Sequence, residues 1–314
     1  MGRRCSIKQS PFNMPQRQNR NRSDLNNGSI RLRPDCHLRP EQTTKLARAR
    51  PFLKWPGGKR WLASEIINHI SSRLRGRYFE PFLGGGAVFF ALRSPNATLS
   101  DINSDLINAY RQVRENPEAL VKRLRRKRIS ANNYYRVRAA KPACPLERAV
   151  RFLYLNRTAF GGMYRLNGDG RFNVPYGGGD RTPAPLWRQN LINTASQLLK
   201  GVKLLVSDFE EIMEQAGPGD VVYCDPTYTV AHENNGFIRY NEVNFSWSDQ
   251  KRLASVALRA MRRGTTVIIS NACHGEIREL YWPYEPTTRV RKSLISPEVS
   301  FRREVHEYLF ILEE

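Results

Sequence analysis

The sequence has little cysteine and no long apolar run. Five cysteines are scattered over 314 residues without the paired spacing of a zinc site, which argues against a disulfide framework and a structural metal. No apolar stretch approaches the roughly 20 residues that cross a bilayer, and no apolar signal core follows the N-terminus. We therefore expect no membrane segment, no metal and a reducing, cytoplasmic environment.

Negative charge is also scarce. The chain has 29 Asp and Glu against 51 Lys and Arg, a formal net charge of +22. Such an excess favours a polyanionic partner, above all nucleic acid, although a solvated basic surface without a partner is the alternative. Residues 1–48 have few acids and almost no apolar periodicity. We expect a disordered basic arm that binds phosphate without sequence preference, with a transit peptide as the alternative.

Strand and helix signals alternate in two parts of the chain, which predicts an α/β fold. After the turn WPGGK (55–59) comes an amphipathic helix, then a strand ending near Phe79, the loop FEPFLGGGAVFFAL, and a strand ATLSD ending at Asp101. Strand, glycine loop, helix, strand and acid make half of a Rossmann-like sheet. Further strands are predicted at 202–208, 220–226, 265–271 and 306–312.

The alternation is interrupted between these two parts. Apolar spacing there predicts helices, and the sequence NGDG at 167–170 predicts a β-hairpin. An inserted, mainly helical domain is the simplest account. The predicted helices cover 106–113, 117–124 and 146–155, and the predicted domains are an arm (1–48), a catalytic domain in two parts (49–103 and 201–314) and the insert (104–200).

Acids flank the glycine loop on both sides. The loop could cradle a phosphate or let a nucleoside lie against the backbone. Glu80, directly before the glycines, would repel a pyrophosphate but suits a cation such as S-adenosylmethionine, which carries a sulfonium and an α-ammonium. Asp101 stands where a carboxylate accepts the hydroxyls of a ribose. A solvated or helix-capping carboxylate is the alternative for each acid.

The stretch DVVYCDPTY ends a buried strand at the sheet edge where open α/β sheets bind ligands. The amine of adenine is a poor nucleophile, so an enzyme that alkylates it must hold its hydrogens. The Asp225 carboxylate and the Pro226 carbonyl are two suitable acceptors, and Tyr228 offers a ring on which an extruded base can stack, worth about 1–3 kcal/mol. A plain turn is the alternative, and Cys224 is expected to be a core thiol.

The motifs together resemble one family, the DNA adenine N6-methyltransferases of the Dam type (D12 class). The resemblance implies S-adenosylmethionine as methyl donor, double-stranded DNA as partner, and a flipped-out adenine, in GATC, as target. It also implies a role in DNA methylation or restriction–modification, and we expect a monomer in a bacterial or phage-infected cell. The motifs that carry it are FLKWPGGK, FEPFLGGGAVF, LSDINSDLINAY, FLYLNRTAFGGMYRLNGDGRFNVPYG, VVYCDPTY, NFSWSDQ and VIISN.

The resemblance also implies roles for single residues. The catalytic tetrapeptide of the family is matched here by Asp225, Pro226 and Tyr228. At its third position this chain has Thr227 where the family usually has proline, so the backbone of Pro226 is less restricted. The donor-binding residues implied are Trp55, Lys59, Glu80, Phe82, Gly84, Gly86, Asp101 and Asp225.

In the insert, Arg165 matches the family's guanine-reading arginine, a bidentate contact worth roughly 1–3 kcal/mol; one more surface arginine is the alternative. Pro175 matches an apolar contact on the thymine methyl and Phe160 an aromatic side chain near the flipped base, whereas Gly161 replaces a larger side chain. Arg157, like the basic cluster 122–128, is expected to contact phosphate. The DNA-binding residues implied are Arg157, Phe160, Met163, Arg165, Asn167 and Pro175.

Three other functions stay open at this point. The same chemistry could act on N4 of cytosine or on adenine in RNA. A binding protein with an inactive catalytic core would use the basic arm and hairpin to coat DNA. An enzyme that uses NAD is disfavoured by Glu80, because that carboxylate would repel the pyrophosphate of the cofactor.

Overall fold

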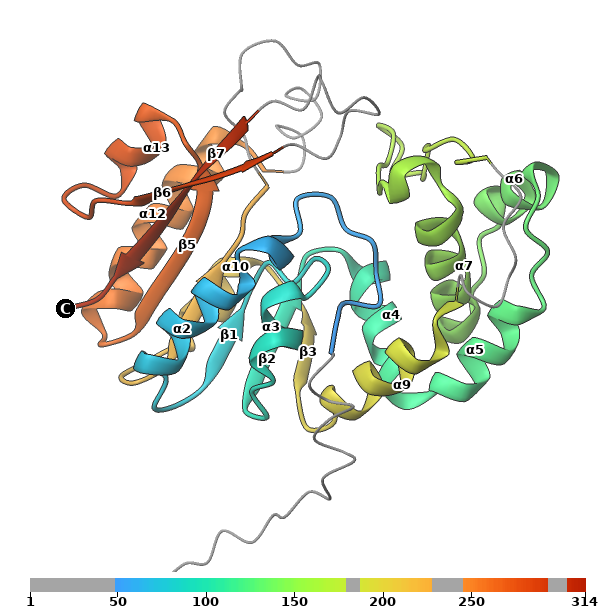
Figure 1. Cartoon of the computed structure of the whole chain (residues 1–314), viewed down its shortest axis with the longest axis horizontal. Helices are drawn as coiled ribbons and strands as arrows, with labels where there is room; N and C mark the ends of the chain where they lie inside the picture. Colours follow the sequence, from blue (N-terminus) through green and yellow to red (C-terminus); the bar gives the residue numbers. More distant parts are fainter. Residues whose placement is uncertain (1–48, 179–186, 228–244, 293–303) are drawn as a thin grey trace, which may run out of the picture. The chain divides into compact units, whose positions relative to one another are not determined.

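The computed structural model describes residues 49–178, 187–227, 245–292 and 304–314. Their strands form a seven-stranded sheet in the order β3-β2-β1-β4-β5-β7-β6 (Figure 1). β7 runs antiparallel to β5 and β6, and the other pairs are parallel. The predicted α/β, Rossmann-like fold is therefore confirmed. The strands are β1 (Tyr78–Glu80), β2 (Ala97–Asp101), β3 (Lys203–Val206), β4 (Val221–Cys224), β5 (Thr266–Ala272), β6 (Thr287–Lys292) and β7 (Glu304–Leu312).

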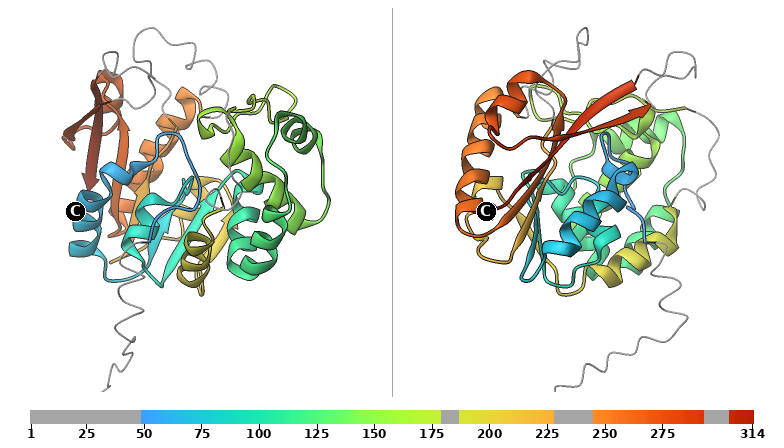
Figure 2. Two further views of the ribbon diagram at one scale, coloured as in Figure 1. Left: turned by 45° about the vertical axis from the view of Figure 1, so that its right-hand side comes forward. Right: turned by 60° about the vertical axis from the view of Figure 1, so that its left-hand side comes forward.

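Both faces of the sheet are covered, which explains why the central strands β1, β4 and β5 are buried in nearly every position. Successive residues of β4 point to opposite faces, so that Tyr223 and Val222 belong to different core clusters. One face packs on α2 (Ala63–Arg73) and α3 (Ala87–Leu92), and the other on α10 (Phe209–Met213), α12 (Trp247–Arg262) and α13 (Gly275–Leu280) (Figures 1 and 2).

The strand order reverses between β1 and β4, because β1 is followed outward by β2 and β4 by β5. A reversal of this kind leaves a crevice at the carboxyl ends of the two strands, since the connections leave them in opposite directions. The glycine loop follows β1, and Asp225 directly follows β4. The topology alone therefore brings the two predicted motifs to one point.

The segment between β2 and β3 is mainly helical, as predicted. α4, α5 and α7 correspond to the three predicted helices, whereas α6 and α9 were not predicted. Leu106 and Tyr110 of α4 share one core cluster with Tyr78 of β1, so the insert and the sheet are continuous. The division of the chain at 103/104 and 200/201 stays a prediction. The helices are α4 (Ser104–Glu115), α5 (Pro117–Arg125), α6 (Ala131–Ala139), α7 (Pro145–Thr158) and α9 (Gln189–Leu198).

The chain turns back on itself at NGDG, so the predicted hairpin is present. Leu166 and Phe172 form an antiparallel bridge. The amide of Asn167 donates to the Arg171 carbonyl (2.8 Å), and that of Asn173 donates to the Arg165 carbonyl (3.0 Å). The buried side chain of Phe172 anchors the returning arm. The hairpin is short, and its side chains at Arg165, Asn167, Asp169 and Arg171 are exposed.

Candidate active site

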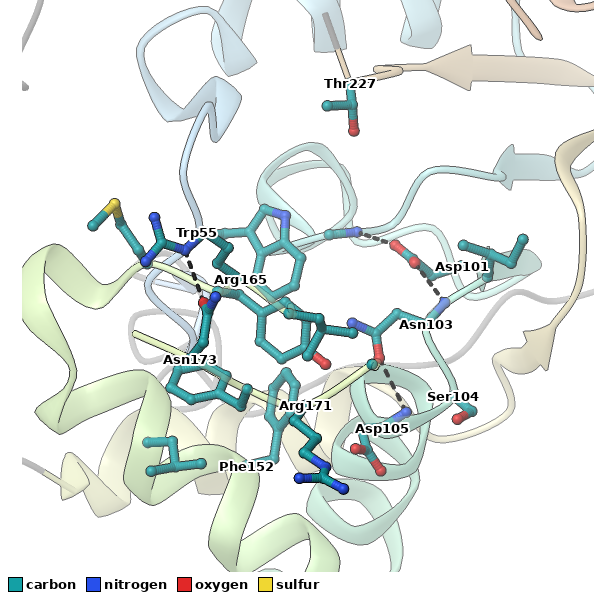
Figure 3. A pocket seen from close by; sticks show the side chains of 18 of the residues that line it. Trp55, Asp101, Asn103, Ser104, Asp105, Phe152, Arg165, Arg171, Asn173 and Thr227 are labelled. Carbon is teal, nitrogen blue, oxygen red and sulfur yellow. Dashed lines mark hydrogen bonds between the residues drawn. The ribbon is translucent and has the colours of Figure 1, made fainter. Parts of the chain in front are cut away.

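A cleft of about 1340 Å³ opens at the carboxyl ends of β1, β2 and β4 and continues to the hairpin. Its walls come from both the sheet and the insert (Figure 3). The structure therefore brings most of the predicted donor-binding and DNA-binding residues to one cavity. Those that line it are Trp55, Phe82, Gly84, Asp101, Met163, Arg165, Asn167 and Asp225.

The glycine loop after β1 is shaped by two residues with left-handed backbone angles. Gly84 has a φ of +45°, and a Cβ there would lie 2.8 Å from Nε1 of Trp55. Gly86 has a φ of +67°, and a Cβ there would lie 2.8 Å from the hydroxyl of Tyr110. Larger side chains would be strained and would collide, so the sequence GGG lets the indole of Trp55 lie directly on the loop.

Asp101, at the end of β2, is held in the floor of the cleft. Oδ2 accepts the amide N–H of Gly84 (3.0 Å) and Oδ1 that of Asn103 (2.9 Å) (Figure 3). Burial raises the pKa of this carboxyl, and the two amide bonds oppose the rise. The carboxylate is thus fixed beside the glycine loop, at the place predicted for a ribose partner.

Glu80 lies deeper, with 3% of its surface exposed. The hydroxyl of Tyr78 donates to Oε2 of Glu80 (2.8 Å). Burial raises the pKa of Glu80 to about 8; the Tyr78 hydrogen bond opposes the rise, and the nearby charge of Asp225 adds to it. An ionised Glu80 is therefore unfavourable in this position unless a positive charge lies close to it.

Asp225 is gripped through one of its two oxygens. Oδ1 contacts Nζ of Lys59 (2.7 Å) and accepts the hydroxyl of Ser270 (2.9 Å). The hydroxyls of Ser270 and Tyr223 are 2.9 Å apart. Burial raises the pKa of Asp225, and Lys59 opposes the rise. The resemblance implied that Lys59 contacts the methyl donor. The structure adds that the ammonium of Lys59 holds the predicted catalytic carboxylate.

The other members of the predicted catalytic set are only partly described. Pro226 is buried behind Asp225, and Thr227 is exposed on the wall of the cleft. Tyr228 lies outside the described residues, so its predicted stacking role stays a prediction.

The predicted DNA-reading residues divide into two groups. Arg165 is exposed, and its Nε donates to Oδ1 of Asn173 across the hairpin (2.8 Å) (Figure 3). Phe160 and Pro175 are also exposed, but they are not among the described residues that line the cleft. The amide of Phe160 donates to the Pro175 carbonyl (3.0 Å), which keeps these two residues together.

The prediction that Arg157 contacts phosphate is wrong. This side chain is 7% exposed, and its guanidinium donates to the carbonyl of Phe52. Burial, together with the charge of Arg188, lowers the pKa of Arg157 to about 10. Arg157 therefore ties the end of α7 to the segment before WPGGK and is almost entirely buried.

Sequence reasoning named Phe82 but missed the aromatic group to which it belongs in the cleft. Phe82 stacks on Phe209 with ring centroids 5.3 Å apart and meets Phe245 edge-on at 5.5 Å. The guanidinium carbon of Arg252 lies 4.2 Å from the Phe209 ring centroid, and Arg252 also pairs with Asp208 (2.8 Å). The signal was an acid and an aromatic residue, SDF, at the end of a predicted strand.

In the described ranges, His, Cys, Asp and Glu side chains form no group of three that could hold a metal ion. None of the helices described combines the length and the apolar character needed to cross a membrane.

Comparison with known proteins identifies the family. The model of the D12 class N6 adenine-specific DNA methyltransferases matches residues 55–293. A type II methyltransferase of Lactococcus lactis subsp. cremoris is 38% identical over 243 residues, 74% of this chain and 84% of the relative. A type II methyltransferase of Methanocaldococcus jannaschii is 34% identical over 286 residues, which cover 83% of this chain and 98% of the relative. A DNA adenine methylase of Salmonella typhimurium is 33% identical over 272 residues, which cover 84% of this chain and 95% of the relative. This chain belongs to the D12 class N6 adenine-specific DNA methyltransferase family.

Proposed function

We propose that this protein transfers a methyl group from S-adenosylmethionine to N6 of a flipped-out adenine in double-stranded DNA. The observation that carries the proposal is that one cleft is lined both by Asp225 and Asp101 of the sheet and by Arg165 of the hairpin. One cavity thus offers an acceptor for the amine, a partner for a ribose and a side chain suited to reading a base.

The donor side of the cleft fits a nucleoside that carries positive charge. The glycine loop admits close approach, Asp101 is poised for ribose hydroxyls, and Phe82 and Phe209 offer aromatic surface for a purine. Glu80 is a buried carboxyl whose ionised form needs a cation nearby. S-adenosylmethionine, when bound here, supplies a methyl group made electrophilic by the adjoining sulfonium.

The acceptor side fits an amine. Lys59 and Ser270 both contact Oδ1 of Asp225, so that Oδ2, which has no partner among the described residues, and the Pro226 carbonyl can accept the two amine hydrogens. The amine nitrogen forms the new bond to the methyl carbon as the methyl–sulfur bond breaks, and the electron pair stays on sulfur. The surplus proton of the amine then leaves through Asp225 to water. Positioning and electrostatics supply the catalysis in this scheme.

The target must leave the duplex, because a paired adenine has its amine bonded to thymine inside the stack. We propose GATC as the sequence read, on the match of Arg165 and the hairpin to the family pattern. We also propose that the enzyme acts as a monomer, in the cytoplasm of a bacterial or phage-infected cell.

The test is incubation of the protein with isotopically labelled S-adenosylmethionine and duplex oligonucleotides, followed by nucleoside analysis and mapping of the modified base. We expect N6-methyladenine in duplexes with GATC and none in duplexes where its first base is changed. Asp225→Ala serves as the inactive control. Labelled N4-methylcytosine, or transfer to RNA in preference to DNA, would overturn the proposal.

A further inference from the structure

Lys59 lies between two carboxylates that come from distant parts of the chain. Its Nζ is 2.7 Å from Oδ1 of Asp225 and 3.6 Å from Oε2 of Glu307. Lys59 is 2% exposed and Glu307 is 0% exposed. Glu307 belongs to β7, the antiparallel strand beside β5, and nothing in the proposed reaction uses it so far. A buried carboxylate that shares a lysine with the catalytic acid calls for an explanation, because burying charge is costly.

The row of charges continues beyond Glu307. Nε of Arg291, on β6, donates to Oε1 of Glu307 (3.0 Å), and Arg291 is 22% exposed. The signs alternate from the surface inward: Arg291 positive, Glu307 negative, Lys59 positive, Asp225 negative. Each charge is thus partly balanced by its neighbours, and the loss of the charge of Arg291 would alter the electrostatic environment of Asp225 through this chain of contacts.

We propose that Glu307 and Arg291 are positioning residues for methyl transfer, which divide the charge of Lys59 so that Asp225 remains a strong acceptor for the adenine amine. The inference rests on the proposed function, in which Asp225 holds that amine. Neither residue touches substrate; both act through Lys59. A purely structural ion network is the competing explanation, and the test below separates the two.

The physical reason is competition for one carboxylate. If Lys59 were paired with Asp225 alone, its ammonium would draw electron density from the oxygens that must accept from the amine, and Asp225 would become a weaker acceptor. The negative charge of Glu307 offsets part of the positive potential that the ammonium of Lys59 exerts on Asp225. Arg291 in turn limits how strongly Glu307 attracts Lys59, so that Lys59 still orients Asp225.

The other ionisable groups near Asp225 do not titrate with it. Glu80, from β1, has its pKa raised to about 8 by burial, and Cys224, directly before Asp225, has its thiol pKa raised well above the usual value by burial. The hydroxyls of Ser270 and Tyr223 are neutral partners. Lys59 lowers the pKa of Asp225 and Glu307 raises it. The acid limb of the rate profile therefore reports the titration of Asp225, which Lys59 and Glu307 influence in opposite directions.

The experiment is the single-turnover rate of methyl transfer as a function of pH, with donor and duplex saturating. In Glu307→Gln a raising influence is lost, so we expect the acid limb to move to lower pH by about one unit and the plateau rate to fall by up to about tenfold. In Arg291→Gln a positive charge is lost instead, so the limb should move to higher pH. Opposite displacements are the signature of the proposal.

Glu304→Gln is the matched control, because Glu304 lies exposed on the same strand. The pH dependence of the rate of this variant should match that of wild type. Thermal denaturation and donor binding check that each variant is folded. If Glu307→Gln loses stability or rate without a displaced limb, the network is structural and the inference is overturned. If Glu307→Gln does not fold, Arg291→Gln decides: an unmoved limb overturns the inference.

Failure of the proposed function would look different. Full activity of Asp225→Ala would show that methyl transfer does not need this carboxylate, and the proposed function would then fail. An inactive Asp225→Ala together with wild-type titration of both network variants would leave the proposed function intact and reject only the roles of Glu307 and Arg291.

Discussion

The two walls of the cleft hold their functional groups in different ways. On the sheet side, Asp225 is bound by Lys59 and Ser270, which come from separate elements. On the insert side, Arg165 is exposed, and its one partner within the described ranges is Asn173, on the same short hairpin. The sheet wall is set before any substrate arrives, whereas the hairpin wall presents side chains that still have donors to offer.

This difference fits two tasks. A group that stabilises a transition state works best when its orientation is fixed in advance. A group that reads a base edge must be reachable from solvent and must leave its hydrogen-bond donors available. We therefore expect substitutions on the sheet wall to change the rate on every DNA, and substitutions on the hairpin wall to change which DNA is used.

The largest expected effect is that of Asp225→Ala. Both the acceptor and the partner of Lys59 are lost, so the single-turnover rate should fall by about 10²–10⁴-fold, equally for all DNA sequences, while donor binding persists. Asp225→Asn, which keeps one acceptor oxygen, should lie between this variant and wild type. A loss that depends on the sequence of the duplex would break the proposed separation of the two walls.

Arg165→Ala is the next largest. Loss of a bidentate contact to guanine should reduce discrimination against a changed first base of GATC by roughly 1–3 kcal/mol, about five- to 150-fold. Competition assays with paired duplexes measure this ratio. Arg171→Ala is the matched control, because Arg171 is also exposed on the hairpin and lines the cleft; it should weaken all duplexes alike. Unchanged discrimination in Arg165→Ala would make Arg165 an ordinary surface arginine.

The same contrast governs what the sequence could predict. The glycine loop, the strand before Asp225 and the hairpin at NGDG are each encoded within a few residues, and all three occur as expected. β6 was missed because the sequence TTRVRK is polar. α6 was missed because ANNYYRVRA offers little apolar spacing, its buried residues being only Asn133, Tyr134 and Val137.

Side-chain partners across the sheet could not be predicted. Lys59 and Glu307 lie near opposite ends of the described chain, and only the pairing of β5 with β7 brings Glu307 to Lys59. Arg157 was misplaced for the same reason: its burial depends on the Phe52 carbonyl, far away in sequence. The chemistry of a residue type was readable from the sequence, whereas its exposure was set by tertiary packing.

Glu80 offers a test of the sheet wall that uses pH. With a pKa of about 8, Glu80 is mostly protonated at pH 7 and ionised at pH 9. A cationic donor binds the ionised form better, so the ratio of donor affinities, wild type over Glu80→Gln, should rise from pH 7 to pH 9 by up to about tenfold. The ratio cancels the titration of the donor's own ammonium. Calorimetry in several buffers measures the affinities and the released proton; a ratio that is flat with pH would contradict this role of Glu80.

Thr227→Pro is expected to have the smallest effect. A proline at this position would confine Pro226 to extended geometry and remove a backbone N–H, which stiffens the turn that follows Asp225. The orientation of Asp225 already depends on Lys59 and Ser270, so the extra stiffness should change the single-turnover rate by less than about tenfold, for all duplexes alike, with Thr227→Ala as control for the lost hydroxyl. An increase beyond about a hundredfold, some 2.7 kcal/mol of barrier, would mean that the backbone of the turn, and not the side-chain grip on Oδ1, limits how well the sheet wall is set.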